Sequence, residues 1–176
     1  RRMADVNVEV VGVRDGVVYV GCRDAHVYAI DAATGKKKWD YPTSKSWVNA
    51  TPAVRDGIVY AATSDSSRFF ALDAKTGRLR FNFDAKAYVF SSAALAGELA
   101  YIGDHNGKLY AVEAKTGKLA WEFQTEGSKK DPMKILNPDG SLKQEAFAPL
   151  FGDFEDMYLD FNRFISVGAI FGSPAV

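Results

Sequence analysis

The sequence predicts an all-β protein, a β-propeller of four-stranded antiparallel blades, and three observations lead to this prediction. The stretch from Tyr19 to Trp39 recurs from Tyr101 to Trp121 at a constant offset of 82 residues, without a gap. In a middle copy, Tyr60 follows Tyr19 by 41 residues and one residue is inserted further on. Each copy reads as four short strands, and a period near 41 residues is typical of propeller blades, which run to about 40–45 residues.

We expect blade 1 to occupy residues 5–42. An apolar, β-branched run ends at Val13, and Asp15-Gly16 then indicates a hairpin turn into a second run of the same kind. The strands expected in this blade are Val6 to Val13, Val17 to Cys22, His26 to Asp31 and one that starts at Lys36.

Blades 2 and 3 are expected over residues 47–84 and 88–124. Asp56-Gly57 repeats the hairpin turn in blade 2, and Gly97 takes its place in blade 3. The strands indicated in these blades are Thr51 to Val54, Ile58 to Ala62, Phe69 to Asp73 and one starting at Arg78, then Ser92 to Leu95, Lys108 to Glu113 and one starting at Lys118.

A Thr-Gly pair precedes each fourth strand, and each fourth strand carries one large aromatic residue. Glycine permits a positive φ without a Cβ clash, which suits a tight turn. A lone four-stranded sheet exposes two faces, so neighbouring blades must cover each other, and a flat ring can wedge between them. The residues expected to serve this docking are Trp39, Phe81, Trp121, Gly35, Gly77 and Gly117.

The repeat breaks after Phe123, and we expect an insertion over residues 125–166. A Pro-Asp-Gly turn at Pro138 predicts a small hairpin. Aromatic and aliphatic residues then recur every three or four positions, which predicts an amphipathic helix over residues 153–165. This helix is expected either to pack back on the propeller or to bind a protein partner.

Ser173-Pro174-Ala175-Val176 repeats the start of blade 2, Thr51-Pro52-Ala53-Val54, and predicts the first strand of a fourth blade over residues 169–176. Three blades and one strand make an incomplete ring, because propellers have at least about four blades. We therefore expect a fragment of a larger propeller, or one piece of an assembly. Its partners would be the remaining blades, from its own propeller or from another chain.

The pattern Ala-x-Asp-x-x-Thr-Gly-x-x-x-Trp, present at Ala29 to Trp39, resembles the tryptophan-docking motif of the PQQ-type propeller repeats. Such repeats are found in quinoprotein dehydrogenases and in the outer-membrane assembly scaffold BamB and its relatives. Ala111 to Trp121 matches with Glu113 in place of aspartate, and Ala71 to Phe81 matches with phenylalanine in place of tryptophan. The resemblance covers residues 5 to about 124 and implies a periplasmic or extracellular bacterial protein.

The composition limits the kinds of partner and compartment that the sequence supports. Twenty-two basic residues balance 22 acidic ones, so no net field favours nucleic acid, and we expect no nucleic-acid partner. No apolar run is long enough to span a bilayer, and the first residues carry no apolar segment of a signal peptide. The single cysteine, Cys22, excludes a disulfide within the chain and reads as a small buried hydrophobe.

A candidate ligand site lies where the chain enters the first strands, which line the central channel of a propeller. Aromatic rings and hydrogen-bonding groups there suit a flat aromatic ligand, although large side chains are also needed merely to fill a channel. The channel-lining candidates are Trp47, Asn49, Tyr88, Ser91, Asn7 and Glu9, with Thr51 and Phe90 nearby.

No catalytic residue and no metal ligand set stands out. His26 and His105 have no partner at metal-ligand spacing and read as surface turn residues. Asp24, Asp65 and Asn106 repeat once per blade, which suits turn capping better than a calcium site.

Three functions remain open. The first is a non-catalytic scaffold that binds a protein or ligand, as the BamB-like resemblance implies. The second is part of a PQQ-dependent dehydrogenase acting on alcohols or sugars, which by resemblance uses a calcium-held quinone, a carboxylate base and often two neighbouring cysteines. Cys22 is alone, so that cysteine pair is missing here. The third is a sensor domain of a larger protein.

Overall fold

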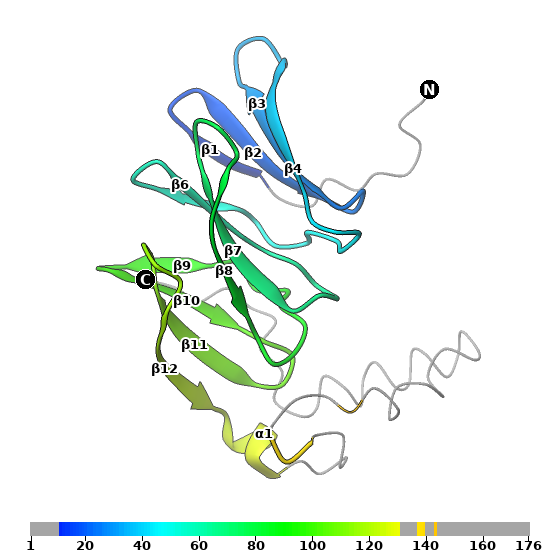
Figure 1. The fold of residues 1–176 in the computed structure, drawn as a ribbon, viewed down its shortest axis with the longest axis vertical. Helices are drawn as coiled ribbons and strands as arrows, with labels where there is room; N and C mark the ends of the chain where they lie inside the picture. Colours follow the sequence, from blue (N-terminus) through cyan, green and yellow to red (C-terminus); the bar gives the residue numbers. More distant parts are fainter. Residues whose placement is uncertain (1–10, 131–136, 140–142, 144–176) are drawn as a thin grey trace, which may run out of the picture.

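The computed structural model describes residues 11–130, 137–139 and 143, and its three antiparallel sheets each contain four strands in sequential order (Figure 1). Every strand pairs with the one before it, so each sheet is a simple meander. The predicted all-β class and the four-stranded antiparallel blades are confirmed. The helix 153–165, the strand 169–176, Asn7 and Glu9 lie outside the described residues.

The described elements are twelve strands and one short helix. They are β1 Val11–Arg14, β2 Val17–Cys22, β3 His26–Asp31, β4 Lys37–Pro42, β5 Ala53–Arg55, β6 Ile58–Ala62, β7 Arg68–Asp73, β8 Leu79–Asp84, β9 Ala94–Ala96, β10 Leu99–Gly103, β11 Lys108–Glu113, β12 Leu119–Gln124 and α1 Glu126–Lys130.

The first strands of blades 2 and 3 start later than expected. β5 begins after Pro52, which has no N–H to donate to a ladder, and the N–H of Thr51 bonds to Ser92 Oγ instead, at 2.8 Å. Helix α1 was not expected from the sequence. Ser128 on α1 donates to the carbonyl of Asn106, which ties the helix to the β10–β11 turn.

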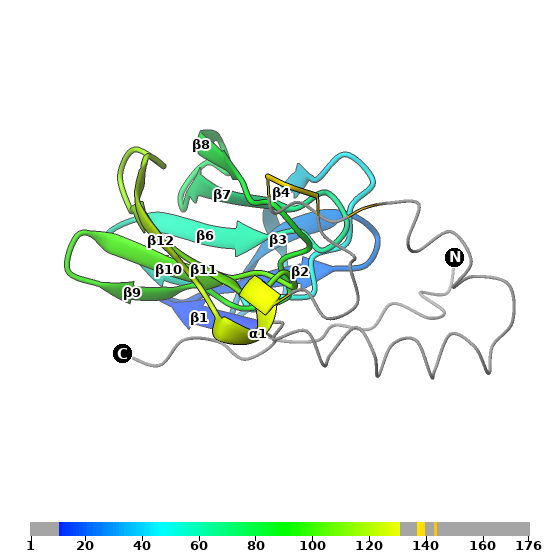
Figure 2. The same cartoon turned by 90° about the horizontal axis from the view of Figure 1, so that it is seen from below.

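The three first strands are neighbours, as expected near the axis of a propeller. β5 contacts both β1 and β9, and Figure 2 shows β1 and β9 along one side of the molecule with β8 toward the opposite side. No helix within the described part of the chain is long and apolar enough to cross a membrane.

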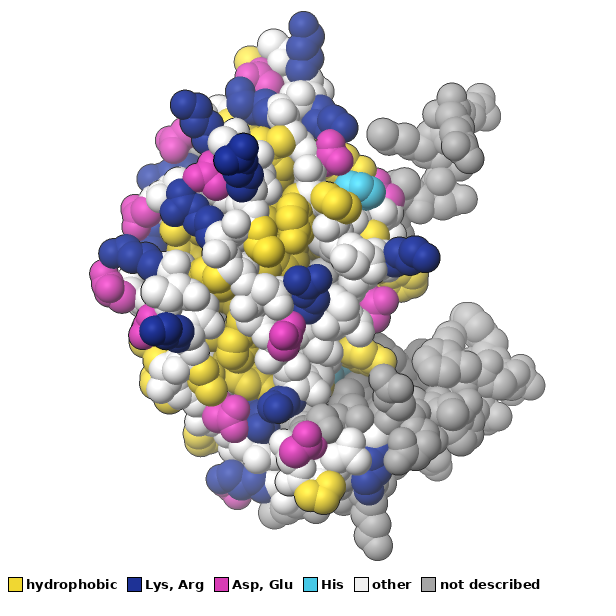
Figure 3. Space-filling view, viewed as in Figure 1, with side chains coloured by type: hydrophobic (Ala, Val, Ile, Leu, Met, Phe, Trp, Pro, Cys, Tyr) yellow, Lys and Arg dark blue, Asp and Glu magenta, His cyan; other side chains and the backbone are white. Residues whose placement is uncertain are grey.

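Two apolar clusters lie between consecutive blades. The first contains Val27, Trp39, Val59 and Leu72 from blades 1 and 2, and the second joins blades 2 and 3 in the same way. In Figure 3 hydrophobic side chains run as stripes across the face shown, while both signs of charge are interspersed around them. The blades are therefore held together by burial of the faces that each sheet would otherwise expose.

In every blade, the pairing register between the third and fourth strands shifts at the same position. In blade 1, Ala29 pairs with Trp39 but Ile30 pairs with Lys37, so Lys38 is the extra residue of a β-bulge. The same shift follows Ala71 and Ala111. A bulge redirects the side chains beside it, and here it adjoins the docking aromatic in every blade.

Candidate functional site

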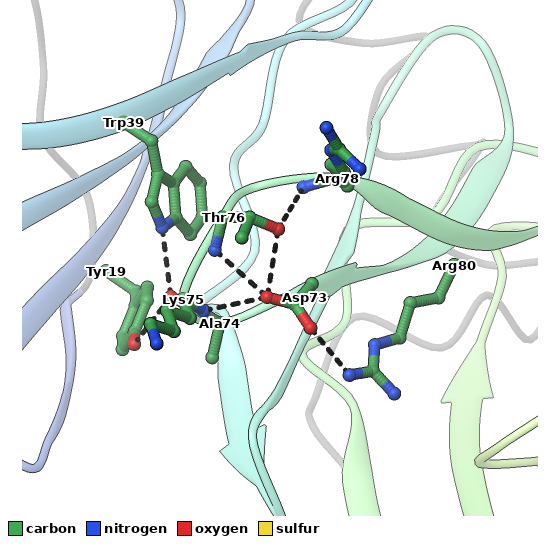
Figure 4. Close-up of polar contacts among 8 residues, drawn as sticks. All are labelled: Tyr19, Trp39, Asp73, Ala74, Lys75, Thr76, Arg78 and Arg80. Atoms are coloured by element: carbon green, nitrogen blue, oxygen red, sulfur yellow. Dashed lines mark hydrogen bonds and ion pairs between the residues drawn. The ribbon is translucent and has the colours of Figure 1, made fainter.

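Two donors from blade 1 converge on one carbonyl of blade 2 (Figure 4). Trp39 Nε1 donates to the carbonyl of Ala74 at 2.9 Å, and Tyr19 Oη donates to the same oxygen at 3.3 Å. The indole also covers Gly77, where an added Cβ would lie 2.8 Å from the ring. Gly77 has φ +72, so both its backbone conformation and its contact with Trp39 require glycine.

The Asp73 carboxylate builds the turn that presents this carbonyl. Its Oδ1 accepts from the N–H groups of Lys75 and Thr76 at 3.1 and 3.0 Å and from Thr76 Oγ1 at 2.9 Å. Arg80 binds Oδ2 at 2.6 Å (Figure 4). The bonds from Arg80 and Thr76 lower the pKa of Asp73 to about 2. The Asp-x-x-Thr-Gly pattern therefore encodes a rigid acceptor for the preceding blade.

The contact between blades 2 and 3 uses the same geometry with one change. Phe81 covers Gly117, where a Cβ would lie 2.3 Å from the ring, but a phenylalanine has no N–H to donate. Tyr60 Oη alone donates to the carbonyl of Ala114, at 3.1 Å. The third docking aromatic, Trp121, is exposed at the edge of blade 3.

The loops 43–52 and 85–93 connect one blade to the next, and with the β2–β3, β6–β7 and β10–β11 turns they form what we call the crossover face. Each loop bonds to the turn of the following blade. Ser64 N–H donates to the carbonyl of Trp47, and His105 N–H donates to the carbonyl of Tyr88, both at 2.9 Å. Trp47 and Tyr88 thus occupy equivalent places, 41 residues apart.

Trp47 and Tyr88 are both exposed on the crossover face, at 49% and 37% of their surface. The guanidinium carbon of Arg23 lies 5.4 Å from the centroid of the Trp47 ring, close enough for a cation–π interaction. Asn49 is half-buried in the same loop, and its amide oxygen is buried without a hydrogen-bond partner among the described residues. The rings of Trp47 and Tyr88 can offer a stacking surface to a ligand, and Arg23 can offer a positive charge.

Ser91 lies inside the protein. Its hydroxyl donates to the carbonyl of Gly103 and accepts from the N–H of the same residue, both at 2.9 Å. The side chain is fully buried, so the hydroxyl serves the fold of blade 3. All four described candidates for the channel lie in the connecting loops. Trp47 and Tyr88 are exposed and Asn49 is half-buried, whereas Ser91 in loop 85–93 is fully buried.

The expectation that His105 is a surface turn residue is wrong. Its side chain is buried, the ring of Phe90 lies 4.3 Å away between centroids, and burial lowers the pKa of His105 to about 4. The reason is tertiary, because loop 85–93 from the preceding connection covers the β10–β11 turn. His26 is half-buried and contacts the Asp24 carboxylate at 3.6 Å.

Asp104, next to His105, is a buried carboxyl that the sequence analysis missed. Its Oδ1 accepts from the N–H groups of Asn106 and Lys108, both at 2.9 Å, and its Oδ2 accepts from Tyr110 Oη at 2.8 Å. Burial nevertheless raises the pKa of Asp104 to about 6. One sequence signal was available, since Asp104-His105-Asn106 replaces Thr63-Ser64-Asp65 of the preceding repeat.

The turn residues Asp65 and Asp24 form hydrogen bonds with nearby residues. Asp65 accepts from Ser46 Oγ and from the N–H of Trp47, at 3.2 Å for the latter, and Asp24 accepts from Tyr28 Oη at 2.5 Å. Cys22 is buried, and burial raises the pKa of its thiol, so little reactive thiolate forms. Within residues 11–130, 137–139 and 143, no group of three His, Cys, Asp or Glu side chains could hold a metal ion.

Comparison with known proteins agrees with this fold. The family described as outer membrane protein assembly factor BamB matches residues 4–136. The serine/threonine-protein kinase AfsK of Streptomyces griseus is 36% identical in an alignment of 175 positions that covers 92% of this chain and 21% of the kinase. The quinohemoprotein alcohol dehydrogenase ADH IIB of Pseudomonas putida is 38% identical in an alignment of 74 positions that covers 36% of this chain and 11% of that enzyme.

Solved structures show the same architecture. BamB from Moraxella catarrhalis is 26% identical, with a TM-score of 0.58 over 65% of this chain and 35% of that one. The quinohemoprotein alcohol dehydrogenase from Comamonas testosteroni is 23% identical and has a TM-score of 0.61 over 76% of this chain and 25% of that enzyme, which shows a shared fold.

The chain spans about a fifth of the kinase and about a tenth of ADH IIB. The family match covers most of the chain, and the docking turns described above lie within it. The chain therefore belongs to the family described as outer membrane protein assembly factor BamB, and it is a PQQ-like β-propeller related to BamB and to the quinoprotein dehydrogenases.

Proposed function

We propose that this chain is a non-catalytic propeller module that binds a protein segment or a flat ligand on its crossover face. The observation that carries the proposal is that two successive blades present an exposed aromatic residue, Trp47 and Tyr88, at the same place. The packing of the core does not account for the exposure of these two rings. Exposed aromatics beside an arginine, here Arg23, are typical of the centre of a binding surface.

A scaffold role also agrees with how the titratable groups are used. Asp104 and His105 have perturbed pKa values, which is often a mark of an active site. Both are buried, however, and both oxygens of Asp104 already accept hydrogen bonds from the protein. Membership of the BamB family favours a protein partner and a bacterial periplasmic or extracellular location.

The second candidate is a sensor domain within a larger protein. Its support is the similarity to the kinase AfsK, which extends over 92% of this chain and leaves most of the kinase outside the match. The same crossover face would then bind the signal. A longer reading frame that joins this propeller to a catalytic domain would favour this candidate.

The dehydrogenase candidate rests on the match to ADH IIB. PQQ held by calcium needs a cluster of oxygen ligands. Among the described residues, no group of three His, Cys, Asp or Glu side chains lies together to contribute to one. Cys22, alone and buried, does not supply the cysteine pair of that resemblance. The described residues therefore give this candidate no support beyond the sequence match.

The test is selection of peptides from a random library on the immobilised protein, followed by measurement of their Kd by fluorescence anisotropy. Alanine at both Trp47 and Tyr88 is expected to weaken binding by roughly tenfold or more, since loss of a central aromatic costs about 1 kcal/mol or more. Leu79→Ala is the matched control, because Leu79 is similarly exposed but lies on β8. Its Kd should equal that of the unchanged protein.

Selected peptides that bind the double variant with unchanged Kd would contradict the proposal. A parallel assay adds PQQ and calcium with an alcohol or glucose and a redox dye. Dye reduction that depends on the protein would favour the dehydrogenase candidate, and its absence together with peptide binding would favour the scaffold.

A further inference from the structure

The backbone of Trp47 is bound at both of its polar groups. Its N–H donates to Asp65 Oδ1 at 3.2 Å, and its carbonyl accepts from the N–H of Ser64 at 2.9 Å. Both partners lie in the β6–β7 turn of blade 2, whereas loop 43–52 starts from the end of β4 in blade 1. The exposed ring of Trp47 is therefore carried by a piece of backbone that is fixed to the following blade.

Asp65 Oδ1 accepts hydrogen bonds from two segments at once. Besides the N–H of Trp47, it accepts from Ser46 Oγ and from Ser64 Oγ, at 3.0 Å for the latter. Ser46 Oγ in turn accepts from the N–H of Ser66 at 3.1 Å. Burial opposes ionisation of the Asp65 carboxyl, but the hydrogen bonds from Ser46, Ser64 and Trp47 outweigh burial and lower its pKa. The side chain is thus a charged acceptor at neutral pH, which suits several donors.

The turn that precedes Trp47 contains two residues in the left-handed region. Ser44 has φ +57 and Lys45 has φ +73, and neither is a glycine. Such conformations cost free energy and persist only where surrounding contacts hold them. Thr43 Oγ1 donates to the carbonyl of Ser46, and the N–H of Ser46 donates to the carbonyl of Thr43 at 3.2 Å. The loop is therefore held in a bent form that its own residues do not favour.

Blade 3 shows that the repeat can fold without this carboxylate. Tyr88 occupies the place of Trp47, and its carbonyl likewise accepts from an N–H of the next turn, that of His105. Asn106, however, takes the place of Asp65, and among the described residues no acceptor in that turn bonds to the N–H of Tyr88. No residue of loop 85–93 has a positive φ. The contacts of Asp65 are therefore an addition to the repeat at the loop that carries Trp47.

We propose that Asp65 is a positioning residue of the crossover face: its carboxylate fixes loop 43–52 so that the Trp47 ring stands outward beside Arg23 before a partner arrives. This inference rests on the proposed function and extends it from the ring that makes contact to the residue that holds the ring in place. A loop that is ordered before binding loses less conformational entropy on binding, so affinity rises without a new contact.

The first measurement is the exchange of backbone N–H groups with water, by NMR on the full chain labelled with [15N]tryptophan, which reports on its three tryptophans. Trp47→Phe assigns the Trp47 signal. In Asp65→Ala this N–H should exchange faster by roughly tenfold or more, because its acceptor is gone. The signals of Trp39 and Trp121, which lie in strands, should keep their exchange rates, which also shows that the variant is folded.

Asp65→Asn is the matched control. It removes the charge, but its amide oxygen can still accept the same hydrogen bonds, so the Trp47 N–H should exchange about as slowly as in the unchanged protein. The second measurement is the Kd of the peptides selected on the immobilised protein. Asp65→Ala should weaken binding by about three- to tenfold, since the loop must then be ordered on binding, and Asp65→Asn should bind like the unchanged protein.

An unchanged exchange rate of the Trp47 N–H in Asp65→Ala would overturn the proposal, and so would faster exchange with an unchanged Kd. Equal loss of affinity in Asp65→Ala and Asp65→Asn would also overturn it, since the partner would then respond to the charge of Asp65. If alanine at both Trp47 and Tyr88 leaves the Kd unchanged, the proposed function fails, while the exchange rates still show whether Asp65 holds Trp47. The two failures are therefore distinguishable.

Discussion

Trp39 and Ala74 are 35 residues apart in sequence, and a 2.9 Å hydrogen bond from the indole nitrogen to the backbone oxygen joins them across two blades. The bond ends on a turn that Asp73 holds in place through several hydrogen bonds. Small sheets that are unstable alone are thus fixed at a defined mutual position. Four predictions follow from this interface and from the polar residues of blades 1 and 3.

Replacement of Trp39 should separate the contribution of the ring from that of its N–H. Trp39→Phe keeps a ring over Gly77, as Phe81 does over Gly117, and should lower the free energy of unfolding by about 1 kcal/mol. Trp39→Ala also opens a cavity and should cost about 3–5 kcal/mol. Urea unfolding measures both. Trp47→Phe, at an exposed site, is the control, and equal losses from Trp39→Phe and Trp39→Ala would contradict the prediction.

Gly77→Ala should destabilise the protein more than Gly57→Ala. Both glycines have nearly the same φ, +72 and +71, so both variants bear the same backbone strain. Only at position 77 does the new Cβ meet the ring of Trp39, which adds a cost of about 1–3 kcal/mol for overpacking. Thermal unfolding of the two variants measures the difference. Equal melting temperatures would show that the ring moves away freely.

Asp104 and His105 should make opposite contributions to the pH dependence of stability. The pKa of Asp104 is raised from 3.8 to about 6, so the folded state binds this proton more tightly and stability falls by about 3 kcal/mol between pH 4 and 6. The pKa of His105 is lowered from 6.5 to about 4, so the unfolded state binds more protons and stability rises over pH 4–6.5. The two effects partly cancel.

Asp104→Asn should therefore expose the His105 contribution. An asparagine Oδ1 can still accept from the N–H groups of Asn106 and Lys108, so the turn is expected to persist. Urea midpoints at pH 4, 5, 6 and 7 should change little for the unchanged protein and should rise with pH for the variant. The same pH profile in both proteins would show that Asp104 does not titrate in this range.

Cys22 should react slowly with a thiol reagent in the folded protein. The side chain is buried and burial raises the pKa of its thiol, so both access and thiolate are limited. In concentrated urea the reaction should become fast. Lys118→Cys in a Cys22→Ala background gives an exposed thiol for comparison. Equal rates for the two folded proteins would mean that the β2 end opens readily.

Local patterns were sufficient to predict much of the fold. The strands β2 and β6 begin directly after Asp-Gly turns, and β3 and β11 end shortly before Thr-Gly pairs, so these turns bound them in the sequence. Neighbouring strands pair in sequence order. A tight turn and the run beside it are properties of a few adjacent residues. The start of β5 was less accurate because the N–H of Thr51 bonds to Ser92 in the next blade.

The environment of a polar side chain was harder to predict. His105 and Ser91 are buried because a connecting loop packs on β10 and its turn, and this contact is tertiary. The residue at the place of Asp104 differs in every copy, being Cys22 and Thr63 in blades 1 and 2, so the repeat itself did not predict a buried carboxyl there. The exposure of Trp47 and Tyr88 likewise depends on how loops from two blades lie.

Each blade contacts only its neighbours, and blade 2 alone among the three described blades is covered on both faces. In a linear array of this kind, the free energy of local opening depends on how many interfaces must break. Among the described blades, amide hydrogens of β6 and β7 should thus exchange with solvent most slowly. Two interfaces, one on each face, must break before blade 2 opens, so its exchange measures their combined strength.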